Sequence, residues 1–409
     1  MKHFLFASCC LLLLLPQVRA QRACGAHDLL LEASRVNPSL SNPIVPHQSV
    51  MKADSDTPGE VPVIKIPVVV HVLFNNDQQN ISEAQIRSQI EVLNKDFRRL
   101  NADTSFIPLA FRSLSADCRI EFRLASSDPA GRATKGIVRR ATSVRAFSID
   151  PGIMSTASGG SDPWDAASYL NIWVAPLTRG LVGYSSPPGI RKDLDGVVIA
   201  FNAFGTTGTA QAPYNKGRTA THEIGHWLGL RHIWGDTDCG DDYIEDTPPQ
   251  SGSTNGCPSG IVSTCNNGPN GNMYMNFMDF TDDACISMFT AGQSAVMRSL
   301  FDEGGNRHSL LQSIGLSAPM YPALPEEQLP VPVSLRLFPN PASGSVQLDT
   351  EQQLDGQPVV IRNYAGQLVM QTSVNRGGRI MLNGLKNGMY FLSVGKSKVM
   401  KLFVSAGVL

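Results

Sequence analysis

The chain of 409 residues has almost no net charge, because 34 lysines and arginines stand against 35 aspartates and glutamates. Without a basic excess it has no general electrostatic attraction for nucleic acid or anionic membrane, so neither is an expected partner. Beyond its first residues it has no apolar run long enough to span a bilayer, and it has no internal repeats. The chain is too long for one ordinary core, so at least two domains are expected.

The amino-terminal segment 1–20 has the pattern of a secretory signal. Lys2 precedes the apolar run Leu11–Leu15, and Val18–Ala20 forms a small-residue cleavage pattern. The apolar run is too short for a transmembrane helix. Gln21 follows the cleavage pattern, whereas a lipid-anchored start would need a cysteine there. We therefore expect an exported, soluble mature chain without a transmembrane segment.

Eleven consecutive residues, HEIGHWLGLRH at 222–232, have the residue types of a catalytic zinc site. His222 and His226 are four residues apart, so on a helix both imidazoles project from one face and can bind one Zn²⁺. Gly229 permits a left-handed turn that would bring His232 back as the third nitrogen ligand. Glu223 could act as the general base toward a water molecule at the open fourth position. The alternative is an amphipathic helix with surface histidines, but the added glycine and third histidine make a chance match remote.

Composition divides the mature chain at two places. Residues 37–62 and 317–332 are rich in Pro, Ser, Asp or Gly and lack periodicity, as linkers do. We expect a propeptide with its linker at 21–60, a catalytic domain at 61–316, and a second domain at 333–409 after the proline-rich linker.

Apolar patterns predict the main elements of the catalytic domain. Residues 63–74 are rich in Val and Ile, as a buried strand is, and a helix begins at Ser82 with a capping box completed by Gln85. The zinc-motif helix begins after Gly217. Residues 182–185 form either an edge strand that could bind an extended peptide or an ordinary loop. Further strands are expected at 120–124, 170–174 and 197–201.

Downstream of the zinc motif the chain is rich in Gly, Asn, Asp and Cys, which is poor material for a packed core. Its carboxylates suggest a calcium-binding loop, or a solvated acidic surface loop: Asp236, Asp238, Asp241, Asp242, Glu245 and Asp246. Four cysteines lie in the same region: Cys239, Cys257, Cys265 and Cys285. In an exported protein they imply two disulfides with three possible pairings. They lack the close C-x-x-C pairs of a zinc ribbon.

The motif HEIGHWLGLRHIWGD at 222–236, together with NFMDF at 276–280, resembles the pappalysin family of metzincin metalloproteases, in particular its bacterial, ulilysin-like and mirolysin-like branch. The resemblance covers residues 61–315. It implies an α+β catalytic domain with a twisted, mostly parallel sheet, an active-site helix and a methionine turn. Met278 would then be the apolar floor of the zinc site, and its sulfur would not ligate.

The same resemblance implies three further features. The disulfides would join Cys239 to Cys265 and Cys257 to Cys285. Calcium would bind near the acidic loop, with these candidate ligands: Asp242, Asp246 and Thr247. In arginine-preferring relatives an aspartate two residues before the last cysteine lies at the base of the S1′ pocket. That position is Asp283 here, which predicts cleavage on the amino side of Arg or Lys. The alternative is an aspartate that only shapes a turn.

Arg22–Gly25, at the start of the expected mature chain, resembles the cysteine-switch prosegment of bacterial pappalysins. The thiolate of Cys24 could bind Zn²⁺ in place of water and keep the enzyme latent. The alternative is an unpaired thiol in a disordered tail. Release would need a cut in the linker 37–62, for which a self-cut before Lys52 is one candidate. Cys118 is expected to be a buried free thiol.

The last segment, 333–409, alternates apolar and polar residues in short runs separated by turns, which is typical of a small antiparallel β-sandwich. The runs are 345–348, 359–364, 368–374, 379–382, 389–394 and 399–404. FPNP at 338–341, YAGQ at 364–367 and LKNGMY at 385–390 resemble the C-terminal sorting domain of the type IX secretion system of Bacteroidota. The type IX machinery is therefore an expected partner, and the cell surface or exterior, reached through the periplasm, the expected location. A carbohydrate-binding module is the alternative, but the segment lacks an evident aromatic platform.

Together these features predict a secreted zinc endopeptidase that acts on proteins or peptides and is made as a latent zymogen. Zinc would activate water, and Glu223 would take its proton and pass it to the departing amine, without a covalent enzyme intermediate. One position departs from the family, in which a tyrosine commonly lies two residues past the turn methionine. Here that residue is Phe280, and losing one such donor can cost about 10²-fold in rate. The alternative function is therefore a weakened metzincin-like protein that serves in binding or adhesion.

Overall fold

The computed structural model describes residues 23–45, 61–178, 180–323, 336–349, 354–363, 367–394 and 400–405. The expected signal, the candidate cut before Lys52 and residues 324–332 of the second linker lie outside this part of the chain. The described residues form two seven-stranded sheets, one before and one after residue 330.

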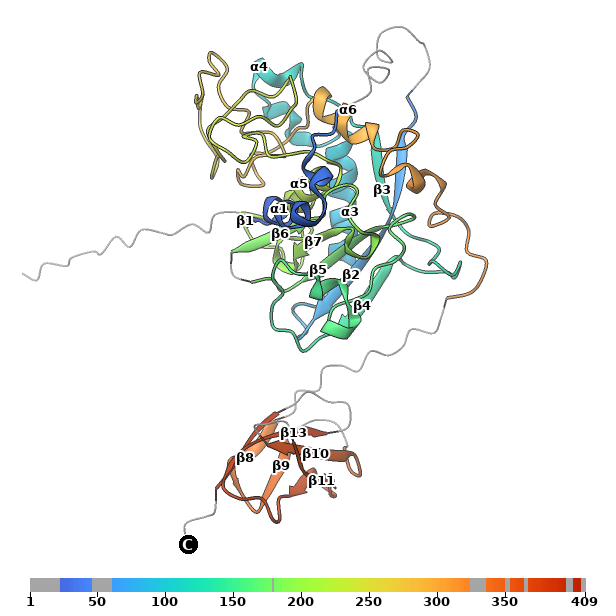
Figure 1. Ribbon diagram of the computed structural model, residues 1–409, viewed down its shortest axis with the longest axis vertical. Helices are drawn as coiled ribbons and strands as arrows, with labels where there is room; N and C mark the ends of the chain where they lie inside the picture. Colours follow the sequence, from blue (N-terminus) through green and yellow to red (C-terminus); the bar gives the residue numbers. More distant parts are fainter. Residues whose placement is uncertain are drawn as a thin grey trace, which may run out of the picture.

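The first sheet has the strand order β1-β6-β7-β5-β2-β3, with β4 also paired to β2 (Figure 1). Its strands are β1 (Ala23–Cys24), β2 (Ile64–Phe74), β3 (Ile120–Leu124), β4 (Ile137–Ala141), β5 (Leu170–Ala175), β6 (Leu181–Ser185) and β7 (Val197–Ala200). β2 runs parallel to β3, β4 and β5, and β5 runs parallel to β7. β6 is antiparallel to β7. The expected mostly parallel sheet is confirmed.

The length of β2 explains how one strand joins three neighbours. Residues 64–68 pair with β3, whereas residues 70–74 pair with β4 on the same edge. The opposite edge pairs with β5 over residues 68–72. The sequence reading missed β4, whose residues 137–141 include two arginines and are all half-buried.

Both faces of this sheet are buried, which explains why its central strands are rich in apolar residues. Val70 and Val72 of β2 lie in one core cluster with Ile86 and Ile224, which come from helices. On the other face Leu73 packs with residues that include Phe147 and Ile153, Trp173 and Tyr184. The helices of this part are α1 (Ala26–Val36), α3 (Glu83–Phe97), α4 (Leu109–Arg112), α5 (Arg218–Trp227) and α6 (Ala291–Ser299).

The start of α3 confirms half of the predicted capping box. The Ser82 hydroxyl accepts a hydrogen bond from the Gln85 backbone N–H at 3.1 Å. The Gln85 side chain does not return to Ser82, so that half of the prediction was wrong. Its amide nitrogen instead donates to the carbonyl oxygens of Phe201 and Phe204, at 3.1 and 2.9 Å. Gln85 therefore ties α3 to the chain that follows β7.

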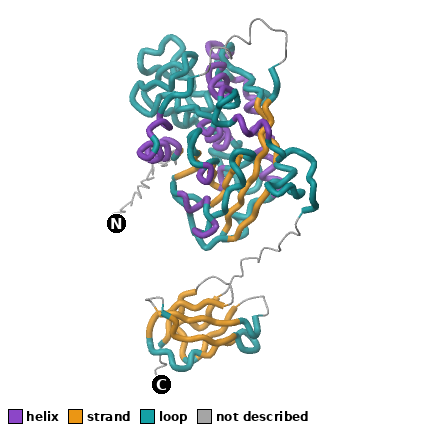
Figure 2. The backbone as a smooth tube through the Cα atoms, turned by 45° about the vertical axis from the view of Figure 1, so that its right-hand side comes forward, coloured by secondary structure: helices purple, strands orange, loops and turns teal. Residues whose placement is uncertain are grey.

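Between α5 and α6 the described chain, residues 228–290, has neither helix nor strand (Figure 2). Two disulfides cross this loop region, Cys239–Cys265 and Cys257–Cys285, with Cα–Cα distances of 5.7 and 5.6 Å. This is the pairing that the family resemblance implies. Each bridge can stabilise the fold by about 2 to 4 kcal/mol, which matters where apolar packing is sparse.

The second sheet forms the expected small all-β region. Its strands are β8 (Arg336–Ser343), β9 (Ser345–Asp349), β10 (Pro358–Asn363), β11 (Leu368–Ser373), β12 (Arg379–Met381), β13 (Gly388–Val394) and β14 (Met400–Val404). Nearly all neighbours are antiparallel, and β14 meets β8 in a short parallel contact. Alternate residues such as Val359 and Ile361 are buried in a core of their own. The sequence reading missed β8, which contains the two prolines of FPNP.

Candidate metal centre

Three histidine side chains meet beside the carboxyl half of α5. Nε2 of His226 lies 3.1 Å from Nε2 of His222 and 3.0 Å from Nε2 of His232. His222 and His226 come from successive turns of α5. His232 comes from the chain after the helix, which turns at Gly229 with φ +86°. The structure thus brings together the three residues that the motif predicts.

The donor set fits a zinc ion. Tetrahedral zinc with nitrogens at about 2.0 to 2.1 Å places those nitrogens about 3.3 Å apart, close to the distances found here. The Nδ1 of His222 contacts the Phe277 carbonyl oxygen at 2.7 Å, and the Nδ1 of His226 contacts the Leu230 carbonyl oxygen at 2.9 Å. Each carbonyl accepts from Nδ1–H, which leaves the Nε2 lone pair for a metal. Burial, together with the charge of His232, lowers the pKa of His226 to about 3 and keeps it neutral, as a ligand must be.

The third histidine is oriented by a carboxylate that the sequence reading had placed in a calcium loop. Asp236 Oδ1 accepts a hydrogen bond from His232 Nδ1. Burial alone would raise the pKa of Asp236, but this hydrogen bond and the nearby histidine charges lower it to about 2. The spacing of His232 and Asp236 by four residues was the only signal that could have suggested their contact.

Aromatic rings enclose the same histidine. The His232 ring stacks on Trp234 with a centroid distance of 4.4 Å, and Phe280 meets it edge to face at 4.9 Å. Phe280 also lies 5.5 Å from the His222 ring. Phe280 therefore packs against two of the three histidines, so the departure from tyrosine places an apolar ring at the metal centre.

The floor of the site is a close contact between α5 and the methionine turn. Met278 is fully buried, and its sulfur would lie 2.5 Å from a methyl group added to Gly225. Only glycine at position 225 leaves room for the methionine sulfur beneath the helix. Asn276 fixes the turn because its side-chain oxygen accepts a hydrogen bond from the Met278 N–H at 2.9 Å.

The thiol of Cys24 joins the three imidazoles. Its Sγ and one ring nitrogen from each histidine all lie within 4.8 Å of one another. Sγ is also 3.5 Å from Oε2 of Glu223, which is fully buried. Burial and the charge of Glu223 raise the pKa of Cys24 well above its usual value, so a thiolate here requires a cation among the histidines.

The amino-terminal segment reaches this position by joining the sheet. β1 pairs in parallel with β6, and the Gly25 N–H donates to the Gly183 carbonyl oxygen at 3.0 Å. The expected edge strand is therefore present, and residues 23–25 cover it. The side chain of Glu223 explains why residue 183 is a glycine, since a methyl group there would lie 3.0 Å from Glu223 Cγ. A second contact of the segment is His27, whose Nδ1 is 3.1 Å from Oδ2 of Asp236.

Asp283 is fully buried at the amino end of α5. Its Oδ2 accepts hydrogen bonds from the backbone N–H groups of Lys216 at 2.9 Å and Arg218 at 3.2 Å. Gly217, the residue before the helix, offers no side-chain cap, so Asp283 satisfies these amides from a distant segment. Arg218 itself is buried and pairs with Asp103 at 2.9 Å, a partner that the sequence reading missed.

The predicted calcium ligands separate into two places. The Thr247 hydroxyl contacts both carboxylate oxygens of Asp242, at 2.8 and 2.9 Å. Burial raises the pKa of Asp242 to about 7. Asp246 instead accepts hydrogen bonds from the Thr290 hydroxyl and the Gly292 N–H, at 2.6 and 2.8 Å, at the start of α6. Among the described residues, neither aspartate belongs to a cluster of three or more metal-binding side chains.

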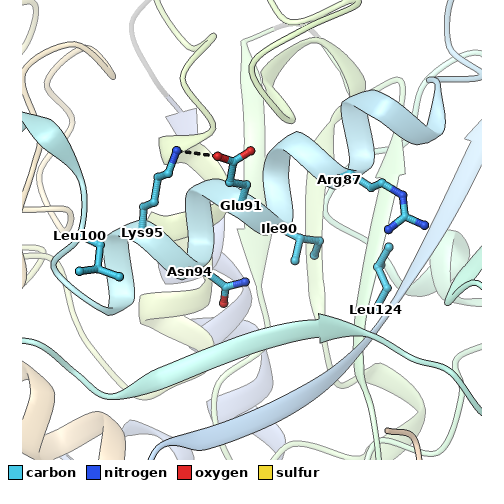
Figure 3. Close-up of a pocket in the computed structure, with 7 residues that line it drawn as sticks. All are labelled: Arg87, Ile90, Glu91, Asn94, Lys95, Leu100 and Leu124. Carbon is cyan, nitrogen blue, oxygen red and sulfur yellow. Dashed lines mark hydrogen bonds and ion pairs between the residues drawn. The ribbon is translucent and has the colours of Figure 1, made fainter. Parts of the chain in front are cut away.

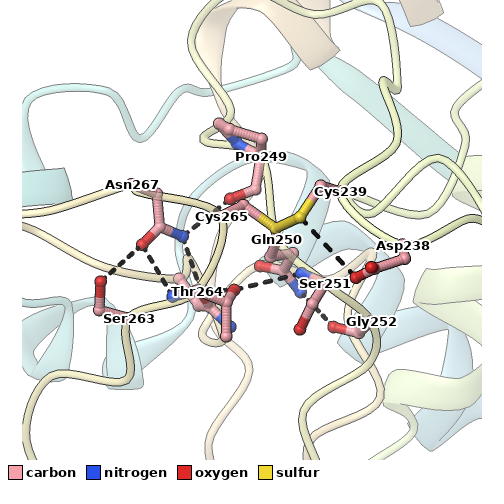
Figure 4. The surroundings of a disulfide bond; sticks show 11 residues. Asp238, Cys239, Pro249, Gln250, Ser251, Gly252, Ser263, Thr264, Cys265 and Asn267 are labelled. Atoms are coloured by element: carbon pink, nitrogen blue, oxygen red, sulfur yellow. Dashed lines mark hydrogen bonds between the residues drawn. A yellow bond between two sulfur atoms is a disulfide. The ribbon is translucent and has the colours of Figure 1, made fainter.

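The Cys239–Cys265 disulfide closes the other end of this loop (Figure 4). Asn267 organises the chain beside it, because its side chain donates to the Pro249 carbonyl oxygen at 2.8 Å and accepts from Ser263 at 3.1 Å. The bridge and these polar contacts hold loop segments that have no regular structure.

A hollow of about 460 Å³ lies on α3 near β3 (Figure 3). Its polar side chains already have partners. Lys95 pairs with Glu91 at 2.6 Å, and the Asn94 amide exchanges hydrogen bonds with the backbone of Phe122. It holds none of the histidines, so the metal centre remains the candidate site.

Comparison with known proteins agrees with this geometry. Residues 158–302 match the sequence profile of the peptidase family described as pregnancy-associated plasma protein-A. An extracellular metalloprotease of Verticillium alfalfae is 32% identical over 252 residues, which cover 59% of this chain and 78% of that protein. The chain belongs to the pappalysin family. An extracellular metalloprotease of Arthroderma benhamiae is 29% identical over 297 residues, covering 70% of this chain and 86% of the relative.

Solved pappalysin structures match as well. Mature mirolysin of Tannerella forsythia in complex with a cleaved peptide is 50% identical, with a TM-score of 0.61, and the match covers 62% of this chain and 97% of mirolysin. A mutant of promirolysin from the same organism is 44% identical, with a TM-score of 0.64, covering 71% and 97%. The fold is therefore that of a metzincin, and the chain is a zinc metalloendopeptidase.

The carboxyl-terminal region has a match of its own. Residues 336–404 match the secretion-system C-terminal sorting domain, which confirms the expected type IX secretion and extracellular location. Within the part of the chain that the structure describes, no helix combines the length and apolar character needed to cross a membrane.

Proposed function

We propose that this pappalysin is made as a latent zymogen and that, once its amino-terminal segment is removed, it cleaves peptide bonds before Arg or Lys. The observation that carries the catalytic part is the convergence of the Nε2 atoms of His222, His226 and His232 beside the buried carboxylate of Glu223. These three nitrogens would hold the zinc. We further propose domain limits of 21–60, 61–316 and 333–409.

The residues of the chain divide the chemistry among them. Zinc, when bound, supplies a Lewis acid that polarises a peptide carbonyl and acidifies water. Glu223 takes the proton of the attacking water and gives it to the departing amine, so no covalent bond to the enzyme forms. Phe280 excludes water from one side of His232 and His222 but offers no hydrogen bond to the reacting oxygen.

Latency would come from Cys24. Its sulfur occupies the space between the histidines and Glu223, where substrate and water must enter. Residues 23–25 also cover β6, the edge that an extended substrate would pair with. The promirolysin match supports this proposal, because it extends over a larger share of the chain than the mature form does.

A preference for Arg or Lys on the carboxyl side of the cleaved bond would come from Asp283. A buried carboxylate attracts a guanidinium strongly. Its Oδ2 accepts hydrogen bonds from the backbone N–H groups of Lys216 and Arg218, which hold the carboxylate at the amino end of α5.

A structural calcium ion near Asp242, Asp246 and Thr247 is a further proposal. Burial makes the charge of Asp242 costly, and a bound cation would offset that cost. Calcium added to the purified protein should raise its melting temperature, with magnesium as the control. An equal shift in an Asp242→Asn variant would place any such ion elsewhere.

The decisive experiment compares wild type with Glu223→Ala on casein and on arginine-containing peptides. The variant should keep its zinc, measured by elemental analysis, and lose at least about 10²-fold in kcat/KM. Equal turnover by wild type and by Glu223→Ala would refute the proposed peptidase mechanism. It would favour instead a role in binding, for which Phe280 is the one structural argument.

A further inference from the structure

A groove of about 210 Å³ lies beside the metal centre, past the carboxyl end of α5. One wall comes from the chain at the end of β6 and the other from the turn that carries Gly229. The amino-terminal segment covers the remaining side. The residues of the catalytic domain that line the groove include Ser185, Pro187, Pro188, Gly229, Leu230 and Arg231.

In the described arrangement an aliphatic side chain of the amino-terminal segment, that of Ile44, lines this groove and lies against Gly229. A methyl group added to Gly229 would lie 2.4 Å from Cδ1 of Ile44 and 3.6 Å from Cγ of Pro188. Ile44 is half-buried and packs against the main core of the catalytic region. The lack of a side chain at Gly229 therefore does more than permit the turn toward His232. It also leaves the space that Ile44 occupies.

The same segment is held by its backbone next to the groove. The Arg231 guanidinium donates a hydrogen bond to the Ser41 carbonyl oxygen. Arg231 lies over the ring of Tyr243, with Cζ 4.8 Å from the ring centroid. This contact holds the guanidinium at the rim of the groove. One aliphatic pocket and one carbonyl-binding cation are features that any extended peptide could use.

We propose that the groove is a substrate subsite that accepts an aliphatic side chain on the amino side of the scissile bond. In the active protein the side chain of a substrate residue would replace that of Ile44. A backbone carbonyl of the substrate would replace that of Ser41 as the acceptor for Arg231. The inference rests on the proposed function, since it assumes that the segment leaves and that peptides are cleaved at the histidine site.

The position of the groove relative to α5 determines which side of the cleaved peptide bond it would bind. Asp283, proposed to bind the residue after the cleaved bond, caps the amino end of α5 at Arg218. Gly229 lies past the carboxyl end of the same helix, which is ten residues or about 15 Å long. His222 and His226 lie between these points on the helix. A peptide that places its P1′ residue near Asp283 and crosses the metal therefore brings the residues before the bond to the groove.

The test is a map of cleavage sites on a peptide library, made with the protein after its amino-terminal segment has been removed and with its carboxyl-terminal domain retained. Ile, Leu and Val should be enriched at one position before the cleaved bond. Peptides with Ile there should show about tenfold higher kcat/KM than peptides with Gly, the range expected for a pocket that buries a few methyl groups. A flat profile at every position before the bond would overturn the inference.

Two variants fill the groove from its rim. Pro188→Phe and Asn306→Phe should each reduce the tenfold ratio toward one, mainly through KM. Asn306 is exposed at the edge of the groove, so its substitution should not disturb folding. It therefore still tests the groove if the change at Pro188 impairs folding. Pro129→Phe is the matched control, because Pro129 is exposed in a turn that contacts residues 320–321 and should leave the ratio unchanged.

The outcomes separate the two proposals. Absence of cleavage in any peptide by wild type would contradict the proposed function itself. Cleavage before Arg or Lys without an aliphatic preference, or with that preference only after the bond, would remove the subsite and leave the proposed function in place. An unchanged ratio in both filled variants would show that another surface supplies the preference.

Discussion

The sulfur of Cys24 lies 3.5 Å from the carboxylate of Glu223, and it also lies within 4.8 Å of one ring nitrogen of each of the three histidines. One side chain of the amino-terminal segment thus occupies the place where the metal ligands and the base meet. Blocking either the metal ligands or the base would suppress hydrolysis, so in the proposed latent form this contact would act on both requirements of the reaction.

The first prediction concerns this contact. Replacing Cys24 with Ala should shorten the lag before activity appears in the purified zymogen, because the segment loses its bond to the metal but keeps its pairing with β6. Progress curves on a fluorogenic peptide measure the lag. Cys118→Ala is the control, since Cys118 is a buried free thiol away from the cluster. A lag unaltered in the Cys24 variant would count against the thiol switch.

The second prediction concerns the carboxylate behind His232. Asp236→Asn should weaken zinc binding by about 10- to 100-fold, because a neutral amide oxygen replaces the carboxylate that orients the His232 ring and raises its basicity. Competition with a chromophoric chelator gives the zinc affinity directly. Asp238→Asn removes an equal charge two residues away, from an exposed position, and should change the affinity little. Equal losses in both variants would point to net charge as the cause.

The third prediction separates two roles of Asp283. Asp283→Ala should abolish the preference for Arg or Lys and also reduce the free energy of unfolding by about 1 to 2 kcal/mol, because Lys216 and Arg218 lose their acceptor. Asp283→Asn keeps an oxygen acceptor but removes the charge, so it should lose the preference with a smaller loss of stability. Cleavage maps and denaturant titrations measure the two effects. A preference retained in the Asn variant would exclude the charge as its origin.

The fourth prediction is a pH dependence that arises away from the site. His71 is buried between Ser161 and Asn171, and burial lowers its pKa from 6.5 to about 4. A base with a depressed folded pKa stabilises the fold fully above its unfolded pKa, and this contribution is lost as the pH falls through the folded value. We expect a loss of at most about 3 kcal/mol between pH 6.5 and 4.

Denaturant titrations of wild type and His71→Gln across this range check the prediction. The variant cannot bind the proton, so the difference between the two proteins isolates His71 from the many carboxylates that titrate below pH 5. If both proteins lose stability in parallel, His71 contributes nothing to the acid sensitivity.

The elements with strong local patterns could be predicted from the sequence. β2 and β5 are largely buried and are rich in apolar residues, and α5 carries its own motif. The histidines were predictable because their spacing alone determines which of them share a helix face. β4 was missed because its two arginines break the apolar pattern, and β1 because two residues carry no periodicity.

Long-range contacts explain the remaining errors. Asp236 was grouped with the carboxylates of the acidic loop because the sequence shows only that it lies among them, whereas its partner is determined by how the chain turns after His232. The left-handed conformation of Asp236 itself, φ +59°, belongs to that turn. The cap that Asp283 supplies to α5 likewise joins residues 65 apart in the chain, a distance over which no local pattern extends.

The parallel pairing of residues 23–25 with β6 places the proposed inhibitory strand and the enzyme in a single molecule. While the chain is intact, the tether keeps the inhibitory strand at a local concentration in the millimolar range. A cut in the linker 37–62 would turn the same contacts into an encounter between two molecules. Dilution outside the cell would then favour departure of the strand, so the proposed activation would require separation as well as cleavage.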